Sequence, residues 1–438
     1  MNEELKALAA QFPPDKPLYA VGGCVRDELL GREVYDIDLT SACLQEQAES
    51  FALKAGMRVS LGSKRLGTVI IKGKSSYEYT PFRVDSYPAG SGVHKPTQVR
   101  FTQDIQEDAR RRDFTVNALY RNISTGETVD LLGGEEDLKN RLLRAVDDPM
   151  RVLGEDGLRI MRLYRFVSTL GFDAEEETER AACAKSPLLN DIAPERIRVE
   201  LDKLLEGEHV GKALRGLVKC GAMQVILPEF CENTGVKQNP AYHRYDVDEH
   251  IIKAVEYAPA RVRLAALLHD IGKGRCVKED GNMYRHAEVG AQMAEEIMTR
   301  LRYPKAEIKR TVRLVALHMT DMRGDMRECK LRRFIADNAD IVDDLTDLII
   351  ADAKATCDNA DIDKCLRIKR LRDKMAQEGV PFSVGELAVN GRDVAEFGYS
   401  GEQVGRVLKE LFALTLTGEK KNDRKALLAV LEKRNNHD

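Results

Sequence analysis

The 438-residue sequence lacks any apolar run approaching the roughly 18 residues that a membrane-spanning helix requires. It also lacks a signal-peptide layout, because its first residues, MNEELKALAA, are acidic. Its nine cysteines form no CxxC pair, so neither a disulfide framework nor a thiolate zinc site is indicated. These absences favour a cytoplasmic protein that has no membrane partner, and they leave its oligomeric state open.

The sequence also has no excess of basic residues. Its formal net charge of -4 argues against a uniformly basic surface that coats nucleic acid. The total charge still allows a local basic face, and arginines cluster at 109–112, 158–165 and 366–372. Each cluster is more often a solvated helix face than a phosphate-binding site. A nucleic-acid interface would therefore have to be local.

The chain divides into an α+β part and a longer helical part. Its length predicts several domains, because one domain usually takes about 100 to 200 residues. Short β-rich runs alternate with glycine and proline turns as far as Leu143, and helical periodicity follows Pro149. We therefore predict an α+β fold that consists of a head with a mixed sheet over 1–145 and all-α segments over 146–235, 236–375 and 376–438.

The stretch YAVGGCVRDELLGREVYDIDLT, residues 19–40, combines a glycine turn with two closely spaced aspartates. Its pattern predicts a strand, a turn at Gly22 and Gly23, a helix, and a second strand over VYDIDLT. On that strand Asp36 and Asp38 would share one face, about 6.5 to 7 Å apart. Two carboxylates with substrate phosphates suit Mg²⁺, and the glycine turn gives a triphosphate access to backbone N–H groups. The alternative is a solvated strand edge beside an ordinary turn.

This strand-turn-helix-strand layout resembles the nucleotidyltransferase superfamily typified by DNA polymerase β. The resemblance implies a third carboxylate on a neighbouring strand, and Glu78 in YEYT is the candidate. The predicted catalytic carboxylates are therefore Asp36, Asp38 and Glu78, with Mg²⁺ as the cofactor.

A second motif, RRDFTVNAL, begins at Arg111. Arg111 and Arg112 offer guanidinium forks that match phosphate oxygens bidentately. Asp113 and Asn117 would lie at i and i+4 of a helix and face ribose hydroxyls. The alternative is a helix N-terminus that carries surface arginines.

A third motif, EDGLRIMRLYR, spans 155–165 in a helical context. Asp156 and Arg159, at i and i+3, would share a face and read one base edge. The carboxylate accepts from the amino group of cytosine or adenine, and the arginine donates to the adjacent ring nitrogen. U and G present the opposite pattern, at a cost of about 1 to 3 kcal/mol for each opposed group. The pair would therefore admit CTP and ATP and exclude UTP and GTP, unless it is only an intrahelical salt bridge.

With DLLGGEEDL at 130–138, these ordered motifs resemble the class II CCA-adding enzyme and bacterial poly(A) polymerase family. The resemblance covers residues 18–172 densely and the rest more loosely. It implies template-independent addition of CTP and ATP to the 3′ end of tRNA, with Mg²⁺ and with release of pyrophosphate. The predicted nucleotide-binding residues are Gly22, Gly23, Arg26, Asp27, Arg111, Arg112, Asp113, Asn117, Asp156, Arg159, Arg162 and Arg165.

Five of the eight histidines lie between His243 and His318. The sequence AALLHDIGK, which ends an apolar helix with His269 and Asp270, resembles the HD phosphohydrolase superfamily. The resemblance implies a second, divalent transition-metal site. Its implied ligands are His250, His269, Asp270 and Asp352, with His286 and His318 as accessories. A structural remnant without hydrolytic activity is the alternative.

Other functions stay open at this point. A poly(A) polymerase would take ATP alone, and a partial CC-adding or A-adding enzyme would build only part of the CCA end. The stretch 82–101 corresponds to the loop with which complete CCA-adding enzymes switch from C to A, but its interior, PAGSGVHKP, departs from the family's Asp- and Arg-rich form. In a different class, the chain would be a metal-dependent HD phosphohydrolase whose head only binds RNA. Residues 386–412 resemble the family's tRNA-holding tail, or form a helical packing module.

Overall fold

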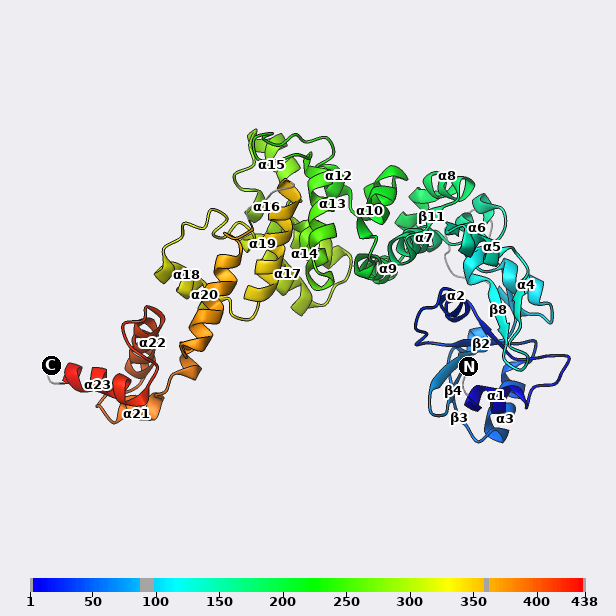
Figure 1. Cartoon of the computed structure of the whole chain (residues 1–438), viewed down its shortest axis with the longest axis horizontal. Coiled ribbons are helices and arrows are strands. Elements are labelled where there is room, and N and C mark those ends of the chain that lie inside the picture. The colour runs from blue at the N-terminus through cyan, green and yellow to red at the C-terminus, as the bar shows by residue number, and fades with distance from the viewer. Residues whose placement is uncertain (1–2, 87–97, 358–361, 436–438) are drawn as a thin grey trace. The chain divides into compact units, whose positions relative to one another are not determined.

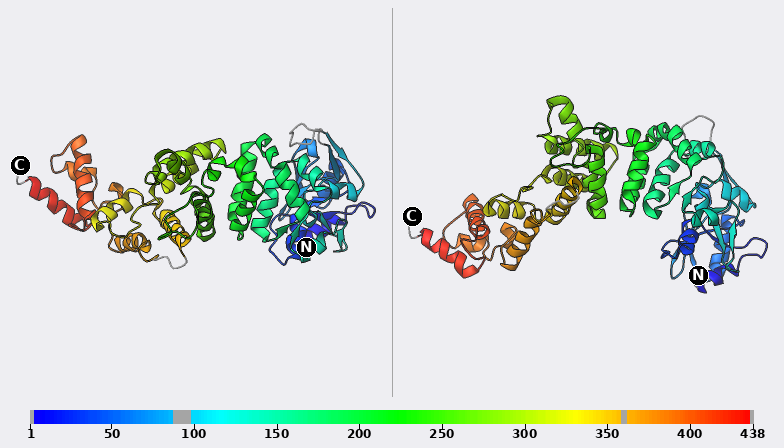
Figure 2. Two further views of the ribbon diagram at one scale, coloured as in Figure 1. Left: turned by 90° about the horizontal axis from the view of Figure 1, so that it is seen from above. Right: turned by 45° about the horizontal axis from the view of Figure 1, so that its top comes forward.

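The computed structural model describes residues 3–86, 98–357 and 362–435, so the interior of the predicted switching loop lies outside the described residues. The chain forms two units, Met1–Cys231 and Glu232–Asp438. Among the described residues, strands occur only in the first unit, and the second unit is helical (Figures 1 and 2). The predicted α+β fold, with a mixed-sheet head followed by helices, is confirmed. No helix in the described part of the chain is long and apolar enough to span a bilayer.

The head is built on a seven-stranded sheet with the order β3-β4-β5-β2-β1-β8-β9. Only β2 and β5 pair in parallel, and every other neighbouring pair is antiparallel. The parallel register sets Asp38 beside Glu78. The strands are β1 (Tyr19–Val21), β2 (Asp38–Thr40), β3 (Arg58–Leu61), β4 (Val69–Lys72), β5 (Ser76–Tyr79), β8 (Leu119–Asn122) and β9 (Thr128–Asp130).

Short helices and a two-stranded ribbon complete the head. The helices are α1 (Glu3–Ala9), α2 (Gly23–Leu29), α3 (Gln45–Lys54), α4 (Ile105–Arg110) and α5 (Gly134–Lys139), with 3-10 turns η1 (Lys64–Leu66) and η2 (Thr115–Asn117). The ribbon pairs β6 (Arg83–Ser86) with β7 (Gln98–Phe101). The Asp104 carboxylate accepts from the Gln106 N–H and so caps α4, which removes one unpaired donor from the start of that helix.

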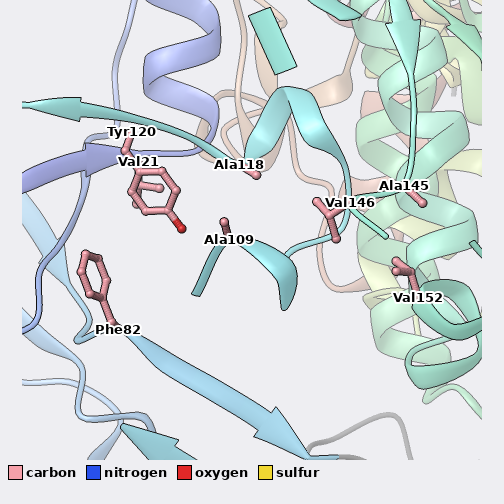
Figure 3. Close-up of a cluster of buried hydrophobic side chains, with 8 residues drawn as sticks. All are labelled: Val21, Phe82, Ala109, Ala118, Tyr120, Ala145, Val146 and Val152. Atoms are coloured by element: carbon pink, nitrogen blue, oxygen red, sulfur yellow. The ribbon is translucent and has the colours of Figure 1, made fainter. Parts of the chain in front are cut away.

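A buried apolar cluster joins the sheet to the first helix of the helical part (Figure 3). Val21 and Tyr120 come from adjacent strands, Phe82 precedes β6, and Val152 lies on α6. Figure 3 shows the Tyr120 hydroxyl directed toward Ala109 on α4. Removing these apolar side chains from water is favourable by roughly 25 cal/mol per Å² of buried surface, so the cluster stabilises the packing of α6 against the head.

The remaining helices of the first unit begin at Pro149, as the change of pattern predicts. They are α6 (Pro149–Glu155), α7 (Leu158–Leu170), α8 (Glu176–Lys185), α9 (Pro194–Glu206), α10 (Val210–Lys219), α11 (Ala222–Ile226) and α12 (Pro228–Cys231), with η3 (Ser186–Asp191) and a short parallel pair, β10 (Leu142–Leu143) and β11 (Asp173–Ala174). Helix α7 buries Ile160, Leu163 and Val167 at helical spacing. Gly216 lets α10 approach it, because a Cβ there would lie 2.3 Å from the Tyr164 ring.

The second unit begins with a helical layer that carries the clustered histidines. Its helices are α13 (Val247–Tyr257), α14 (Arg263–Leu268), α15 (Lys273–Asp280), α16 (His286–Arg300), α17 (Lys305–Leu317), α18 (Glu328–Asp337) and α19 (Val342–Thr356), with η4 (Ala260–Val262). The chain continues through α20 (Leu366–Gln377), η5 (Val384–Glu386), α21 (Gly391–Ala395), α22 (Glu402–Leu416) and α23 (Arg424–Asn435).

Two local predictions are wrong in extent. The strand expected over 34–40 starts only at Asp38, so Asp36 lies in the segment without regular secondary structure that leads into β2. The continuous helix expected over 155–165 is interrupted, because α6 ends at Glu155 and α7 begins at Leu158. Asp156 adopts an extended conformation at this break, with φ -143° and ψ 104°.

Candidate nucleotide-binding and metal sites

A cavity of about 520 Å³ opens within the first unit, and we call it the arginine cavity. Eight arginines line it against four aspartates, which makes it strongly cationic. Such a concave basic site suits a polyanionic ligand such as a triphosphate. Its lining residues are Gly22, Gly23, Arg26, Asp38, Arg83, Asp85, Arg111, Arg112, Asp113, Asn117, Asp156, Leu158, Arg159, Arg162, Arg165, Phe166 and Arg196.

The glycine turn forms one wall of this cavity. Gly22 has φ +83°, a conformation that residues with a Cβ rarely adopt, and it precedes α2. The prediction of strand, glycine turn and helix is therefore confirmed, including the end of the helix just before Gly31. Arg26, on the first turn of α2, is buried and binds the Asp27 carboxylate through two hydrogen bonds of 2.9 Å. Asp27 itself does not line the cavity.

A chain of hydrogen bonds links α2 to α7 across the cavity. Arg26 Nη1 donates to Asn117 Oδ1 at 2.6 Å, and Asn117 Nδ2 donates to Asp113 Oδ1 at 3.0 Å. Arg162 Nε donates to Asp113 Oδ2 at 2.7 Å. Burial by itself raises the pKa of Asp113, but the Arg162 charge and the hydrogen bond from Asn117 outweigh it and hold the pKa well below its usual range. Asp113 is therefore an ionised, buried carboxylate that links the head to α7.

A second buried carboxylate, Asp108 on α4, holds the two arginines of the RRD motif. Its Oδ1 accepts from Arg111 Nε at 2.7 Å, and its Oδ2 accepts from Arg112 Nη2 at 3.0 Å. The Tyr120 hydroxyl donates to the same Oδ2 at 2.7 Å and accepts from Arg112 Nε at 3.1 Å. Arg112 Nη1 lies 3.6 Å from where a Cβ on Gly22 would stand, which places this guanidinium at the glycine turn.

The ring of Phe166 on α7 packs against three of the arginines that line the cavity. The guanidinium carbons of Arg26, Arg162 and Arg165 lie 5.1, 5.5 and 4.3 Å from the centre of its ring. Cation–π contacts of this kind hold arginine side chains in place without neutralising their charge. Burial and the neighbouring charge of Arg162 lower the pKa of Arg165, as expected where cations crowd together.

Two of the three predicted catalytic carboxylates, Asp38 and Glu78, lie at or next to the arginine cavity. Asp38 lines both this cavity and an adjoining one of about 200 Å³, which Glu78 also lines. Protein atoms around the Asp38 carboxylate raise its pKa, Arg112 opposes this, and Asp36 adds to it. Burial and the Asp38 charge raise the pKa of Glu78. Carboxylates that disfavour each other's ionisation in this way attract a cation. Asp36 is exposed and lines neither cavity.

Asp156 and Arg159 both line the arginine cavity, but they do not share one face of a continuous helix as predicted. Asp156 Oδ1 accepts from the Leu158 N–H at 3.0 Å, and Arg196 Nη2 donates to Asp156 Oδ2 at 3.1 Å. Arg159 Nη2 donates to the Arg111 carbonyl at 2.7 Å. The helix break at Gly157 turns Asp156 toward α9, where Arg196 lies.

The arginine cavity therefore gathers every predicted nucleotide-binding residue except Asp27. Of the three predicted catalytic carboxylates, Asp38 lines this cavity, whereas Asp36 and Glu78 do not. The sequence interpretation missed Arg83, Asp85, Phe166 and Arg196 in the cavity lining, and it missed Asp108 behind it. Phe166 directly follows the third motif, so helical periodicity across it would have flagged that residue. Arg83 and Asp85 lie at the start of the predicted switching loop, over 82–101, but nothing in the local sequence connects them with residues on α7.

In the second unit, five buried side chains converge on a sixth, Asp270, in a cluster that we call the HD centre. His250, His269, Asp270 and Asp352 have ligand atoms within 4.8 Å of one another, and so do Asp270, His286 and His318. The two groups share Asp270. His250 Nε2 lies 3.1 Å from Asp270 Oδ2, whereas His286 Nε2 lies 3.3 Å from Asp270 Oδ1. This geometry would let one carboxylate serve two cations, one on each oxygen.

Each histidine of the HD centre has a main-chain carbonyl next to its Nδ1 atom. The Nδ1 atoms of His269, His286 and His318 lie 2.7, 2.6 and 2.7 Å from the carbonyls of Ala266, Met283 and Val315. His250 Nδ1 lies 3.3 Å from the Ala355 carbonyl. Only a protonated Nδ1 can donate to a carbonyl, so each neutral ring keeps its Nε2 lone pair toward Asp270. This is the arrangement that metal-ligating histidines require.

The two buried carboxylates of the HD centre give it a negative charge that favours protonated histidines or a bound cation. Burial by itself lowers the pKa of His269, but Asp270 and Asp352 more than offset this and raise it to about 10. The same interactions hold the pKa values of both carboxylates below their usual range despite burial. Protons or a divalent cation would supply the missing charge. Lys273 Nζ, 2.6 Å from Asp270 Oδ2, borders a cavity of about 510 Å³ that reaches Asp270 and Asp352.

Comparison with protein families agrees with this division of sites. Residues 18–144 match the poly A polymerase head domain, and residues 171–233 match the probable RNA and SrmB-binding site of polymerase A. Residues 241–345 match the HD domain.

Two curated relatives align over nearly the whole chain. The A-adding tRNA nucleotidyltransferase of Deinococcus radiodurans is 32% identical over 93% of this chain and 93% of its own length. The CCA-adding enzyme of Streptococcus gordonii is 30% identical over 95% of this chain and 93% of its own. The crystal structure of the Bacillus stearothermophilus CCA-adding enzyme in complex with CTP superposes with a TM-score of 0.71, at 25% identity, over 100% of this chain and 99% of that one. The chain belongs to the tRNA nucleotidyltransferase family, in which these A-adding and CCA-adding enzymes are found, and it carries an HD domain.

Proposed function

We propose that this nucleotidyltransferase adds CTP and ATP to the 3′ end of tRNA to build or repair the terminal CCA, releasing pyrophosphate. The observation that carries the proposal is the arginine cavity, whose eight arginines against four aspartates adjoin the carboxylates Asp38 and Glu78. Residues 1–145 would form the catalytic head and 146–235 the base-reading neck, followed by the HD domain over 236–375 and the tRNA-holding tail over 376–438. The cytoplasmic location stays a prediction.

In this proposal the arginine cavity holds the incoming nucleotide. Gly22 and Gly23 let the triphosphate approach the backbone, and the guanidiniums of Arg111 and Arg112 face its oxygens. Asp156 and Arg159 read the base edge, with Arg162 and Arg165 supporting them. Arg196 donates to Asp156 Oδ2 and holds that carboxylate in place as an acceptor, which favours the amino groups of cytosine and adenine. UTP and GTP would oppose acceptor to acceptor and donor to donor.

The carboxylates suit a divalent cation, for which we propose Mg²⁺ held by Asp36 and Asp38 with Glu78 nearby. The fit rests on their placement, since Asp38 pairs with Glu78 in the sheet register and both line the smaller cavity. Surrounding protein atoms and a neighbouring carboxylate raise the pKa of each, which a bound cation would offset. When bound, the cation would activate the primer 3′-hydroxyl and stabilise the departing pyrophosphate. The chain's own contribution is positional: its arginines hold the triphosphate in line with that hydroxyl and offset the negative charge of the leaving group.

The test uses the full chain with Mg²⁺, radiolabelled CTP or ATP, and tRNA that ends before, within or after CCA. We expect CTP on tRNA lacking CCA, ATP on tRNA ending in CC, and no addition to complete tRNA. Addition of ATP only to tRNA ending in CC would instead assign an A-adding role, as in the relative from Deinococcus radiodurans. Unlimited ATP addition to all three RNAs would assign a poly(A) polymerase. Failure to extend any of them would refute the proposal.

A matched pair of variants makes the test specific. Asp38→Asn should abolish extension, because it removes the carboxylate that both cavities share. Asp15→Asn alters an exposed carboxylate of the same unit away from these cavities and should leave extension unchanged. Equal loss in both variants would mean that the site lies elsewhere.

The geometry of the HD centre favours a second candidate activity, hydrolysis of a phosphate ester with a divalent transition metal. Its six converging side chains offer imidazole and carboxylate ligands, and the adjoining cavity leaves Lys273 beside Asp270 to bind a phosphate group. Hydrolysis of a cyclic nucleotide should survive Asp36→Ala and be lost in Asp270→Ala. Loss in both variants, or in neither, would contradict an independent HD activity.

A further inference from the structure

Asp108 lies outside the arginine cavity but is hydrogen-bonded to three of the residues that line it, Arg83, Arg111 and Arg112. Its side chain is fully buried on α4 and accepts hydrogen bonds from four donors. Two of these are the Arg111 and Arg112 side chains, at 2.7 and 3.0 Å. The other two are the Tyr120 hydroxyl at 2.7 Å and the Arg83 backbone N–H at 3.2 Å. None of these contacts involves the predicted metal-binding carboxylates.

The way in which Asp108 binds the arginines leaves part of each guanidinium free to face a ligand. Arg111 is bonded through Nε and Arg112 through Nη2, with Arg112 Nε held by Tyr120. Arg112 Nη1 remains directed at the glycine turn, beside Gly22. Arg111 Nη1 also lies 3.7 Å from Asp85 Oδ2, and Asp85 pairs with Arg83 as well. Three guanidiniums thus face two carboxylates, Asp85 and Asp108, which leaves a net positive charge. Asp108 therefore fixes the orientation of both side chains without cancelling their attraction for phosphate.

We propose that Asp108 is a positioning residue for nucleotidyl transfer. It holds the guanidiniums of Arg111 and Arg112 in the orientation in which they bind the triphosphate oxygens while pyrophosphate leaves. This role rests on the proposed function. Tyr120 contributes to this orientation, because its hydroxyl donates to Asp108 and accepts from Arg112. The arrangement ties the site to the buried cluster of Figure 3, which contains both Tyr120 and Ala109, the neighbour of Asp108.

The charge arrangement predicts a distinctive kinetic signature. Asp108→Asn removes the restraint but leaves both arginines, so the net attraction for the nucleotide rises while its alignment is lost. Interactions that act only in the transition state lower kcat when removed, whereas uniform binding changes KM. We therefore expect kcat to fall about tenfold or more, with the KM for ATP changed by less than about threefold. Tyr120→Phe keeps the carboxylate and should lower kcat about three- to tenfold.

The experiment measures steady-state addition of ATP to tRNA ending in CC, a step that CCA-adding and A-adding enzymes both complete. Asp137→Asn is the matched control. Asp137 is also a buried carboxylate that binds an arginine, Arg144 at 3.2 Å, and a hydroxyl, that of Thr115 at 2.7 Å. Neither of these partners lines the arginine cavity. Its kcat and KM should stay within about twofold of the wild-type values.

The possible results distinguish failure of the proposed function from failure of the role of Asp108. An inactive wild-type chain would overturn the proposed function and, with it, this role. An active wild type with unchanged kcat in Asp108→Asn, or with only KM raised, would overturn the role alone. The same fall in kcat in Asp137→Asn would also overturn it, because the effect would then reflect loss of any buried ion pair. If Asp108→Asn does not fold, an unchanged kcat in Tyr120→Phe overturns the role, and a lowered kcat with unchanged KM supports it.

Discussion

Replacing Asp113 with asparagine should destabilise the first unit measurably, because this carboxylate is the buried link between the head and α7. The variant keeps the shape of the side chain but loses the charge that binds Arg162. Hydrogen bonds to a charged partner contribute about 1.5 to 3 kcal/mol. The Arg162 side chain is 33% exposed, so water replaces part of the lost interaction, and we expect about 1.5 to 2 kcal/mol.

The assay uses a fluorescent probe that reports on the first unit. The chain has no tryptophan, so Met150→Trp, on an exposed position of α6, introduces a single one. Urea unfolding followed by its emission, in the presence and absence of Asp113→Asn, gives the difference in unfolding free energy. A difference below about 0.5 kcal/mol would refute the reasoning, since surface substitutions produce effects of that size.

The pH dependence supplies a second check. The pKa of Asp113 is depressed in the folded state, so its stabilisation is fully present above the unfolded-state value of about 3.9 and is lost as the pH falls toward the folded value. The difference between the parent and Asp113→Asn should therefore stay constant from pH 8 to about 5 and shrink below about pH 4. A difference that already disappears at pH 6 would assign the effect to another group.

Three further substitutions have defined outcomes. Arg196→Met should raise misincorporation of UTP relative to CTP about tenfold in tRNA extension, because Asp156 loses the partner that holds it as an acceptor; unchanged selectivity would rule out this role. Gly216→Ala should lower stability by about 1 to 3 kcal/mol in thermal unfolding, since its Cβ would lie 2.3 Å from the Tyr164 ring, and an unchanged melting temperature would show that the helices can separate. His318→Ala should weaken Mn²⁺ binding at least tenfold by calorimetry while tRNA extension continues; equal Mn²⁺ affinity would exclude this histidine as a ligand.

The features that the sequence predicted well are those that local physics determines. The glycine turn at Gly22 and the end of α2 before Gly31 follow from backbone conformations that glycine adopts readily. The start of the helical part at Pro149 follows from proline at a first helical position and from the Asp148 cap. These signals lie within a few residues of the structure they determine.

The features that sequence reasoning missed depend on contacts between distant residues. Asp108 is one acidic residue among 72 until the fold brings Tyr120 and both arginines to its carboxylate. Arg196 lies 40 residues from its partner Asp156, and no periodicity connects them. Gly157 interrupts the helix expected over 155–165, which the surrounding hydrophobic pattern concealed. The catalytic role of Glu78 stays a prediction, although its pairing with Asp38 gives that prediction a definite geometry.

The four Nδ1 contacts of the HD centre have an evolutionary consequence. Their acceptors are main-chain carbonyls, which every amino acid provides, so the side chains at Ala266, Met283 and Val315 do not specify the tautomers. In each of these three pairs the carbonyl lies three residues before the histidine. The ends of α14 and α17 set that spacing for His269 and His318, and the turn that leads into α16 sets it for His286. Substitutions at these acceptor positions can therefore accumulate without disturbing the imidazoles, provided that the helices persist. The HD centre can therefore keep the orientation of its imidazoles while many of the surrounding residues are substituted.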